Sequence, residues 1–363
     1  MSVDFGAEVQ PGDWLLSCRH GYESEVCSQL QAAGGETSPV FSGLVRVNGT
    51  DEGAEWPVKL DVSYALQMFP AVSLVQRDSL NQLARAVVDH IAGPIDGVAE
   101  PWSLHVLVPG RLRGNPKPPM ARRADLLERA VLDRLSKIRR RAMHHYKPEC
   151  LTPSRLVQVL LWRADAAWVS FSAPRQTEVG GSWPSGWPAG LAPVADDPVA
   201  PASSYRKLEE AMACMGRWPV KGERAVDVGA CPGGWTRVLL RYGATVDAVD
   251  RQPLAPHLMR DRKVHFHRAD AFTWAPDGPV DWWVSDVVAY PDRIIDMAHR
   301  VSTVIRPELV VLQMKFRGEP EHGAVTTALT RLRDAGYGAR ARHFFNDKNE
   351  VTLMARWADG DSR

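Results

Sequence analysis

The 363-residue sequence is poor in cysteine, and its few cysteines are widely separated. They form no Cys-x-x-Cys pair and no Cys/His ligand spacing, and they number five: Cys18, Cys27, Cys150, Cys214 and Cys231. A sparse, odd set of this kind argues against a disulfide framework or a zinc site and is typical of a reducing cytoplasm. We therefore expect no metal and a cytoplasmic location.

Long hydrophobic runs are also missing. No apolar stretch approaches the roughly 18 residues that a membrane span needs, and residues 1–14 lack the basic and then apolar order of a secretory signal. The chain has 45% hydrophobic and 24% charged residues, which is typical of a globular protein. Its length suits two or three domains, and we expect it to have no membrane partner.

The net charge is only +1, but one segment is poor in acids. Between Arg111 and Lys147 there are twelve Lys/Arg and three Asp/Glu, an excess of nine positive charges that could meet a phosphate backbone. Apolar residues at i, i+3 and i+4 over 120–142 predict an amphipathic helix with a cationic outer face. That face is either a solvated surface or an RNA contact, for which the candidates are Arg122, Arg123, Lys137, Arg139, Arg140 and Arg141.

Two regions with mixed helical and strand patterns occupy the N-terminal half. In residues 1–78 the pattern predicts a small α+β unit, with a helix at 22–33 and strands at 14–19, 44–47 and 71–75. In residues 79–175 it predicts helices at 80–91 and 120–142, a strand at 102–108, and a hairpin of strands at 156–161 and 167–171.

Residues 176–202 are rich in proline, glycine and serine and are predicted to be a linker. Trp183 and Trp187 are unusual there, because flexible linkers rarely carry aromatic residues. We favour packing of both indoles onto a domain, and stacking on RNA bases is the alternative.

The third region, 203–363, alternates strands and helices, which predicts an α/β doubly wound sheet of mainly parallel order. Strands are expected at 224–228, 245–249, 264–268, 281–286, 308–314, 340–346 and 351–357. Helices are expected at 205–215, 234–242, 291–305 and 322–335. No helix separates the last two strands, so they should form an antiparallel hairpin at one edge.

A glycine-rich turn at 229–234 follows the first strand of this region and precedes a helix. That order places a ligand at the carboxyl end of the strand, against a helix N-terminus. The glycines stand at 229, 233 and 234, which does not match the G-x-G-x-x-G spacing of dinucleotide sites. A nicotinamide dehydrogenase is therefore the weaker interpretation, and no Gly-Lys-Ser/Thr follows that would indicate a P-loop.

Acidic residues stand at or directly after the first three strands of the region. Asp250, about twenty residues beyond the turn, is placed to accept both ribose hydroxyls of an adenosine cofactor. Asp270 is placed to reach the adenine amino group, and Asp227 belongs to the same series. A single acid of this kind is more often a solvated loop residue, but three in succession favour ligand binding.

These motifs resemble a known family. Asp227–Thr236 (DVGACPGGWT) is similar to motif I of the FtsJ-like 2′-O-ribose methyltransferases, and 201–211 resembles their entry helix. Within that group the chain is identified as a member of the bacterial 23S rRNA (cytidine-2′-O)-methyltransferase (RlmM) family, whose N-terminal motif resembles Leu15–Glu23. The resemblance implies a class I, Rossmann-like methyltransferase domain at 203–363. It also implies a ferredoxin-like domain at 1–78 and a THUMP-like RNA-binding domain at 79–175.

The resemblance also implies the site residues. The Lys-Asp-Lys-Glu tetrad of the family falls on Lys207, Asp286, Lys315 and Glu350. The contacts to S-adenosylmethionine fall on Ser204, Gly229, Cys231, Pro232, Gly233, Gly234, Asp250, Asp270 and Asp286. Arg206, beside Lys207, is the competing base in the entry helix, and the Lys-Leu-Glu-Glu register favours Lys207.

The proposed chemistry needs such groups. A ribose 2′-hydroxyl is a poor nucleophile, so methyl transfer needs alignment and a base for the hydroxyl proton. Lys315 can be that base only when neutral. Burial and Lys207 should lower its pKa, whereas Asp286 should raise it. The alternative is that Lys315 and Asp286 form only a salt bridge at the rim of the sheet.

The sequence therefore predicts a methyltransferase that acts on the ribose 2′-oxygen of a cytidine in the peptidyl-transferase region of 23S rRNA. We expect the chain to be a monomer and its substrate to be naked rRNA or an early assembly intermediate. One alternative is 2′-O-methylation of another RNA, such as tRNA. Another is a non-catalytic RNA-binding assembly factor with a vestigial cofactor pocket.

Overall fold

The described residues of the chain divide into two units. The structure is a computed structural model, and it describes residues 8–49, 62–109 and 120–358. The N-terminal unit contains the described residues up to Thr177 together with Gly181–Leu191, and the C-terminal unit contains Glu178–Gly180 and the residues from Ala192 onward. The beginning of the basic segment, 111–119, lies outside the described residues.

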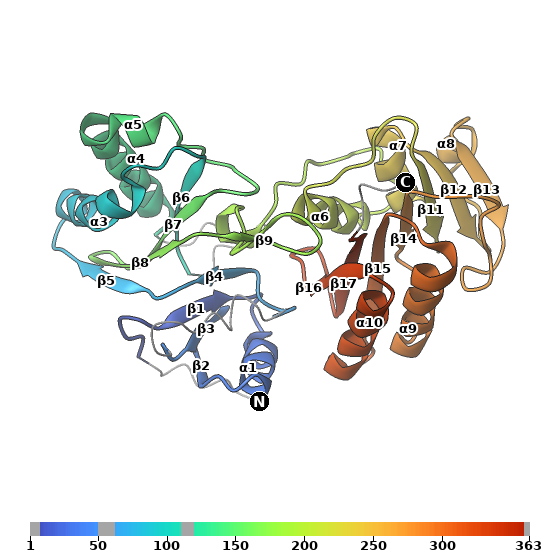
Figure 1. The fold of residues 1–363 in the computed structure, drawn as a ribbon, viewed down its shortest axis with the longest axis horizontal. Coiled ribbons are helices and arrows are strands. Elements are labelled where there is room, and N and C mark those ends of the chain that lie inside the picture. Colours follow the sequence, from blue (N-terminus) through green and yellow to red (C-terminus); the bar gives the residue numbers. More distant parts are fainter. Residues whose placement is uncertain (1–7, 50–61, 110–119, 359–363) are drawn as a thin grey trace. The chain divides into compact units, whose positions relative to one another are not determined.

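A seven-stranded sheet forms the centre of the C-terminal unit (Figure 1). Its order from edge to edge is β13-β12-β11-β14-β15-β17-β16. The strands are β11 (Arg224–Val228), β12 (Thr245–Asp250), β13 (Val264–Arg268), β14 (Trp282–Ser285), β15 (Leu309–Lys315), β16 (Tyr337–Arg342) and β17 (Glu350–Trp357). Strands β11 to β15 are parallel, and β17 runs antiparallel to both β15 and β16. The predicted mainly parallel sheet with a terminal antiparallel hairpin is confirmed.

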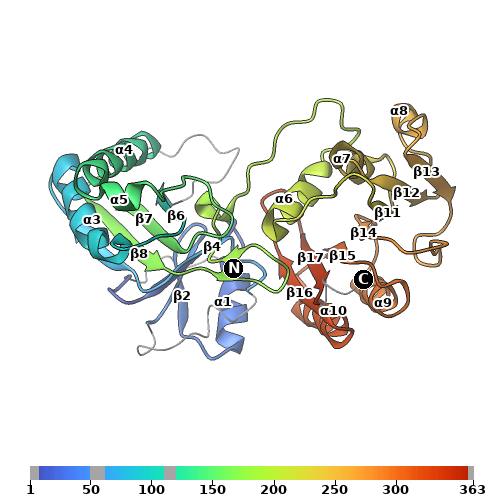
Figure 2. The same cartoon turned by 45° about the horizontal axis from the view of Figure 1, so that its top comes forward.

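Helices cover both faces of this sheet, as Figures 1 and 2 show. They are α6 (Tyr205–Met215), α7 (Gly234–Tyr242), α8 (Pro256–Met259), α9 (Pro291–Arg300) and α10 (His322–Asp334). Helices α6 and α7 pack together, and α9 packs with α10. The apolar stripe of α6 carries Leu208 and Met212, which join Trp235 of α7 and Trp282 of β14 in one buried cluster. Burial of these side chains fixes α6 against the sheet.

Two elements of the C-terminal unit differ from the sequence prediction. The helix predicted at 291–305 is regular only to Arg300, and a π-helical turn, Val301–Ile305, follows it. The strand predicted at 340–346 lies at Tyr337–Arg342 instead. The backbone amide of Phe344 donates to the Asp347 carboxylate (2.9 Å), which turns the chain, so 343–349 is a loop leading into β17.

The N-terminal unit contains two four-stranded sheets. The first, of order β2-β3-β1-β4, consists of β1 (Trp14–Ser17), β2 (Thr37–Phe41), β3 (Leu44–Val47) and β4 (Gln67–Phe69), with helix α1 (Glu23–Ala32) between β1 and β2. The second, of order β5-β8-β7-β6, consists of β5 (Ser73–Gln76), β6 (Trp102–Leu107), β7 (Arg155–Arg163) and β8 (Ala166–Ser172). Three helices share a buried core with the second sheet: α3 (Leu80–Ile95), α4 (Ala121–Ile138) and α5 (Arg140–Met143). Strands β7 and β8 form the predicted hairpin.

One strand belongs to a different sheet from the one predicted. The sequence places the strand at 71–75 in the first α+β unit, but β5 pairs antiparallel with β8 in the second sheet. Val75 is buried in the same core as Leu83 of α3 and Leu127 of α4, and this burial explains its place. A further apolar cluster joins the two sheets through Leu15, Phe69 and Leu107, among others.

The proline- and glycine-rich segment 181–191 packs onto the N-terminal unit. The side chain of Gln67, which is fully buried, donates to the carbonyl oxygen of Ser185 (2.8 Å) and accepts from its amide (2.8 Å). Trp183 is 3% exposed in β10 (Ser182–Trp183), which pairs with β9 (Arg175–Gln176). The expectation that Trp183 packs onto a domain is confirmed. Trp187 is half-buried, just before a short 3-10 helix, Pro188–Gly190.

Candidate active site

The glycine-rich turn follows β11 at the position where the strand order reverses between β12 and β14. Ligands bind at such points in open α/β sheets. Gly229 has φ +74°, and a Cβ there would lie 2.8 Å from the Cβ of Val287. Gly233 has φ +110°, and a Cβ there would lie 2.2 Å from Leu258. Both positions therefore require glycine, which leaves bare backbone on the turn.

Asp250 and Asp270 lie at the same edge of the sheet. The Asp250 carboxylate accepts from the backbone amides of Cys231 (2.9 Å) and Gln252 (2.9 Å), so it is held beside the turn. Asp270 accepts from the amide of Phe272 (2.8 Å) and from the guanidinium of Arg251. Both donors lower the pKa of Asp270, and the Phe272 amide has the larger effect.

Asp227 differs from the other two acids of its series. Its side chain is 1% exposed, and it accepts a hydrogen bond from the hydroxyl of Thr236 in α7 (2.6 Å). Burial raises the pKa of Asp227 to about 7 against the opposing effect of Thr236. Asp227 therefore ties the end of β11 to the first turns of α7, whereas Asp250 and Asp270 remain at the edge where a ligand would lie.

The residues at this edge fit an adenosine cofactor. Carboxylates accept hydrogen bonds from ribose hydroxyls and from an adenine amine. Ser204 lies next to the turn, because a Cβ on Gly234 would lie 2.9 Å from its hydroxyl oxygen. The Trp235 indole also donates to the Ser204 carbonyl (2.8 Å). Backbone without side chains, an adjacent hydroxyl and two carboxylates form a donor and acceptor set for that cofactor.

Two lysines meet one carboxylate beside this edge. Asp286 follows β14, and its Oδ1 lies 2.8 Å from the Nζ of Lys315 and 3.3 Å from the Nζ of Lys207. Lys315, the last residue of β15, also donates to the Asp286 carbonyl oxygen (2.6 Å). Lys207 in α6 pairs with the Oε1 of Glu350 (2.7 Å), the first residue of β17. The four predicted side chains come from α6, β15, β17 and the loop after β14, and they form one continuous cluster.

Burial and charge act in opposite directions on Lys207. Its side chain is 12% exposed, and burial alone would lower its pKa. Asp286 and Glu350 outweigh that effect and raise the pKa of Lys207 above its ordinary value. Burial also raises the pKa of Asp347, which lies in the loop before β17, and the charge of Glu350 adds to the rise. Lys207 is therefore a stable cation in the resting site.

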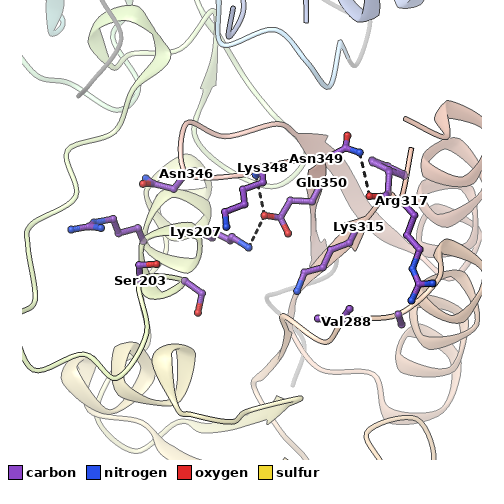
Figure 3. A pocket seen from close by; sticks show the side chains of 13 residues that line it. Ser203, Lys207, Val288, Lys315, Arg317, Asn346, Lys348, Asn349 and Glu350 are labelled. Atoms are coloured by element: carbon purple, nitrogen blue, oxygen red, sulfur yellow. Dashed lines mark hydrogen bonds and ion pairs between the residues drawn. The ribbon is translucent and has the colours of Figure 1, made fainter. Parts of the chain in front are cut away.

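A pocket of about 510 Å³ opens beside this cluster (Figure 3). A volume of this size is within the range of small-ligand sites. Its lining contains five basic residues and one acid: Arg206, Lys207, Lys315, Arg317, Lys348 and Glu350. In Figure 3, Lys207 and Lys315 approach from opposite sides, α6 and β15. The remaining lining residues are Ser203, Ser204, Val288, Ala289, Phe316, Asn346 and Asn349.

The structure distinguishes Lys207 from Arg206. The Arg206 guanidinium lies 2.7 Å from Asp196 and 5.2 Å from the ring centroid of Tyr205. It therefore lines the pocket without joining the lysine and carboxylate cluster, which Lys207 does join. Sequence reasoning missed the pocket residues of the 343–349 loop, Asn346, Lys348 and Asn349, because that loop carries no motif of its own. The available signal was that this loop directly precedes Glu350 of the tetrad.

The predicted RNA-binding arginines and lysine lie on α4 and α5, except Arg139, which stands between the two helices and interrupts the single helix predicted at 120–142. Apolar residues such as Leu127 and Leu135 bury one face of α4, as predicted. Arg122, Lys137, Arg140 and Arg141 are exposed, whereas Arg123 donates to the carbonyl of Ala164 (2.6 Å) and Arg139 pairs with Asp96 (2.8 Å). The set is therefore partly a cationic surface and partly engaged in holding the unit together.

Among the described residues the structure contains neither a metal-binding group of side chains nor a membrane-spanning helix. Within residues 8–49, 62–109 and 120–358, no group of three or more His, Cys, Asp or Glu side chains is arranged to hold a metal ion. In the same ranges, every helix is too short or too polar to cross a bilayer.

A sheet of this order, with a glycine-rich turn after its first strand, is the fold of the class I methyltransferases, and residues 202–329 match the FtsJ-like methyltransferase family. The protein is an S-adenosylmethionine-dependent methyltransferase. It is 30% identical over 367 residues to the ribosomal RNA large subunit methyltransferase M of Alkalilimnicola ehrlichii, with 94% of each chain covered. The protein of the same name from Halorhodospira halophila is 29% identical, with 94% of this chain and 96% of that one covered. The one from Thauera aminoaromatica is 35% identical over 223 residues, 57% of this chain and 59% of that one. The chain belongs to the ribosomal RNA large subunit methyltransferase M family.

Proposed function

We propose that this enzyme transfers a methyl group from S-adenosylmethionine to the ribose 2′-oxygen of a cytidine in the peptidyl-transferase region of 23S rRNA. The observation that carries the proposal is the sharing of one Asp286 oxygen by Lys315 and Lys207, beside a cationic pocket. Family membership supports the large-subunit rRNA as substrate. The particular oxygen and nucleotide rest on the resemblance of the tetrad to that of 2′-O-methyltransferases.

The cofactor is assigned to the glycine-rich turn and its neighbours. The proposed contacts are Ser204, Gly229, Cys231, Pro232, Gly233, Gly234, Asp250, Asp270 and Asp286. When bound, S-adenosylmethionine supplies a methyl group activated by its sulfonium. Asp250 is already oriented by two backbone amides, so it can accept hydroxyl hydrogen bonds without losing conformational freedom.

Lys315 is the proposed general base. Two of the three donor directions of its Nζ point to Asp286, one to the carbonyl oxygen and one to Oδ1. In the neutral amine the two N–H groups fill these directions, and the lone pair occupies the remaining one. Because Lys315 lines the pocket, that lone pair can take the proton of a hydroxyl placed there, and Lys315 becomes an ammonium.

Asp286, Lys207 and Glu350 position this base. The Nζ of Lys315 and the Nζ of Lys207 both lie against the same Asp286 carboxylate oxygen, so this carboxylate holds the two lysines together. Glu350 in turn holds Lys207, and its own Oε1 also accepts from the amide of Lys348 (3.0 Å). These contacts keep the Lys315 amine at a fixed position, which is the alignment that in-line transfer needs.

The N-terminal residues are proposed to hold the RNA. We assign 1–78, apart from β5, to a ferredoxin-like domain, and β5 with 79–175 to a THUMP-like RNA-binding domain. Residues 176–202 are assigned to a linker, of which 181–191 packs onto the N-terminal unit, and 203–363 to the methyltransferase domain. The exposed cations of α4 and α5 would contact phosphates and contribute affinity without sequence choice. We place the enzyme in the cytoplasm, as a monomer acting on naked rRNA or an early assembly intermediate.

The test is methyl transfer in vitro from labelled cofactor to unmodified 23S rRNA, followed by mapping of the modified nucleotide. We expect label on the 2′-oxygen of one cytidine, and its loss in Lys315→Ala. Label on a base, or undiminished transfer in that variant, would contradict the proposal. Competition with tRNA distinguishes the tRNA alternative, and cofactor binding without turnover would indicate a non-catalytic assembly factor.

A further inference from the structure

We propose that the paired side chains of Tyr290 and Arg317 form a stacking platform for an unpaired RNA base next to the methylated nucleotide. The inference rests on the proposed function and names how the same site holds its substrate. The flanking phosphates then lie along the cationic lining of the pocket. The substrate is therefore single-stranded where it enters the site.

The first observation is the geometry of the pair. The Arg317 Cζ lies 4.3 Å from the ring centroid of Tyr290, and its Nη1 donates to the Tyr290 hydroxyl (2.7 Å). Tyr290 is 58% exposed although it makes both of these contacts. Aromatic rings and guanidinium planes are the surfaces on which proteins stack unpaired RNA bases. The pair therefore offers a rigid face to solvent.

The second observation is where this pair stands. Arg317 lines the pocket that Lys315 enters, two residues along the chain from it. Tyr290 follows Val288 and Ala289, which line the same pocket and lead away from Asp286. The segment that follows Asp286 carries Tyr290, and the segment that follows Lys315 carries Arg317. Both halves of the platform are therefore joined directly to the lysine and carboxylate cluster. A base stacked there belongs to a nucleotide adjacent to the one whose hydroxyl faces Lys315.

The segment that carries Arg317 is itself held in place. The Asn349 side-chain amide donates to the carbonyl oxygens of Phe316 (3.2 Å) and Gly318 (2.6 Å), on either side of Arg317. Asn349 directly precedes Glu350, so one short stretch supports both the platform and the catalytic cluster. This link couples the position of the stacked base to that of Lys207.

Charge and shape favour RNA over a small neutral ligand. Arg206, Arg317 and Lys348 add three cations around the two lysines of the cluster, and Glu350 is the single acid of the lining. A pocket of about 510 Å³ suits one nucleotide, and a chain of phosphates extends beyond it along these cations. In an A-form duplex both neighbours of the target base are stacked within the helix, which leaves no free face for Tyr290.

The experiment compares Tyr290→Ala, Tyr290→Phe and Arg317→Ala in the full-length enzyme. Arg331→Ala serves as the charge-matched control, since Arg331 is an exposed residue of α10 outside the pocket lining. With unmodified 23S rRNA we expect Tyr290→Ala to raise KM about tenfold or more, with a smaller effect on kcat. Tyr290→Phe should restore KM, because the ring and not the hydroxyl stacks. An unchanged KM in Tyr290→Ala overturns the platform. A KM in Tyr290→Phe that is raised as much as in Tyr290→Ala overturns it as well.

A binding assay separates this inference from the proposed reaction. The probe is a single-stranded RNA of about ten nucleotides with 2-aminopurine beside a cytidine, and the same strand in a duplex is the comparison. We expect quenching by the wild type and Tyr290→Phe, loss of quenching in Tyr290→Ala, and none with the duplex. Arg317→Ala should also reduce the slope of log K against log salt by about 0.7, whereas Arg331→Ala should not. If the wild type transfers no methyl group but quenches the probe, the proposed function fails and the platform stands. Equal quenching by duplex and single strand refutes the platform alone.

Discussion

Lys315 and Glu350 are direct partners across the antiparallel pair of β15 and β17, yet each turns to a different residue. The amine of Lys315 goes to Asp286, and the carboxylate of Glu350 goes to Lys207. The two ends of the lysine and carboxylate cluster are therefore set by one register position of the sheet. Substitutions of Lys315 and of Glu350 should therefore have separate effects, the first on the proposed base and the second on Lys207.

Replacing Lys315 should remove the proposed general base and leave the cofactor site intact. We expect Lys315→Ala to lower kcat by about 10²–10⁴-fold. Lys315→Arg should be as inactive, because a guanidinium remains protonated at any usable pH. Single-turnover methyl transfer measures the loss, and titration with S-adenosylmethionine should show unchanged affinity. Activity retained in Lys315→Arg would exclude a proton-accepting role.

Glu350→Gln should be less stable than the wild type at neutral and mildly alkaline pH, and the difference should shrink above pH 10.5. The pKa of Lys207 is raised above 10.5, so its ion pairs stabilise the fold fully below that pH and lose this effect as the pH rises through the folded-state value. Glu350→Gln removes one of the carboxylates that raise the pKa of Lys207, so the variant has less of this stabilisation and should lose less of it as the pH rises. Urea unfolding between about pH 8 and 11 measures it. Asp334→Asn, at an exposed position of α10, is the control and should follow the wild type.

A side chain at Gly229 should damage the cofactor site. Gly229→Ala must adopt φ +74° and must push against Val287, whose Cα lies 2.9 Å from the new Cβ. We expect a loss of about 1–3 kcal/mol in stability and weaker binding of S-adenosylmethionine, since Val287 follows Asp286. Gly323→Ala is the matched control, because its Cβ meets nothing within 4 Å in α10. Calorimetric binding and thermal unfolding of both variants check this; equal behaviour would refute it.

Asp227 should make stability depend on pH in the acidic to neutral range. Burial raises its pKa from 3.8 to about 7. The folded protein therefore binds the proton more tightly, and the stabilisation is complete below about pH 4 and is lost as the pH rises through about 7. The change is of the order of a few kcal/mol. Asp227→Asn has no proton to lose, so the difference in unfolding free energy between variant and wild type should vary with pH across this window. A constant difference would show that folding leaves the pKa of Asp227 unchanged.

The exposed cations of α4 and α5 should contribute to RNA affinity through phosphates. The triple variant Lys137→Ala, Arg140→Ala and Arg141→Ala should weaken binding to all RNA sequences alike. It should also reduce the slope of log K against log salt by about 0.7–0.9 for each phosphate that these side chains neutralise in the wild type. Arg85→Ala, 78% exposed on α3, is the control. Filter binding to 23S rRNA at several salt concentrations measures the slope. An unchanged slope in the triple variant would show that the cationic face of α4 and α5 contacts solvent and not RNA.

Much of the C-terminal unit could be predicted because its signals are local. The runs of buried residues in β11 and β12, and the helical stripes of α6 and α7, depend on neighbours a few positions away. The glycine-rich turn is local as well, since the conformations of Gly229 and Gly233 exclude other residues. In the N-terminal unit such signals are weaker. β2 contains Pro39 and β4 has three residues, so neither strand is predicted from the sequence.

Sequence by itself determined which residues are the candidates for the chemistry: the turn, the acids after the strands, and the two lysines with their two acids. Only the tertiary structure decided how they combine. Asp227 lies one residue before the end of β11 and is buried against Thr236 of α7, whereas Asp250 ends β12 beside the turn. β17 entered the sheet between β15 and β16, and that insertion brought Glu350 to Lys207 and the 343–349 loop to the pocket. Contacts between residues so far apart in the chain depend on the register of strands and the packing of helices, which no local pattern contains.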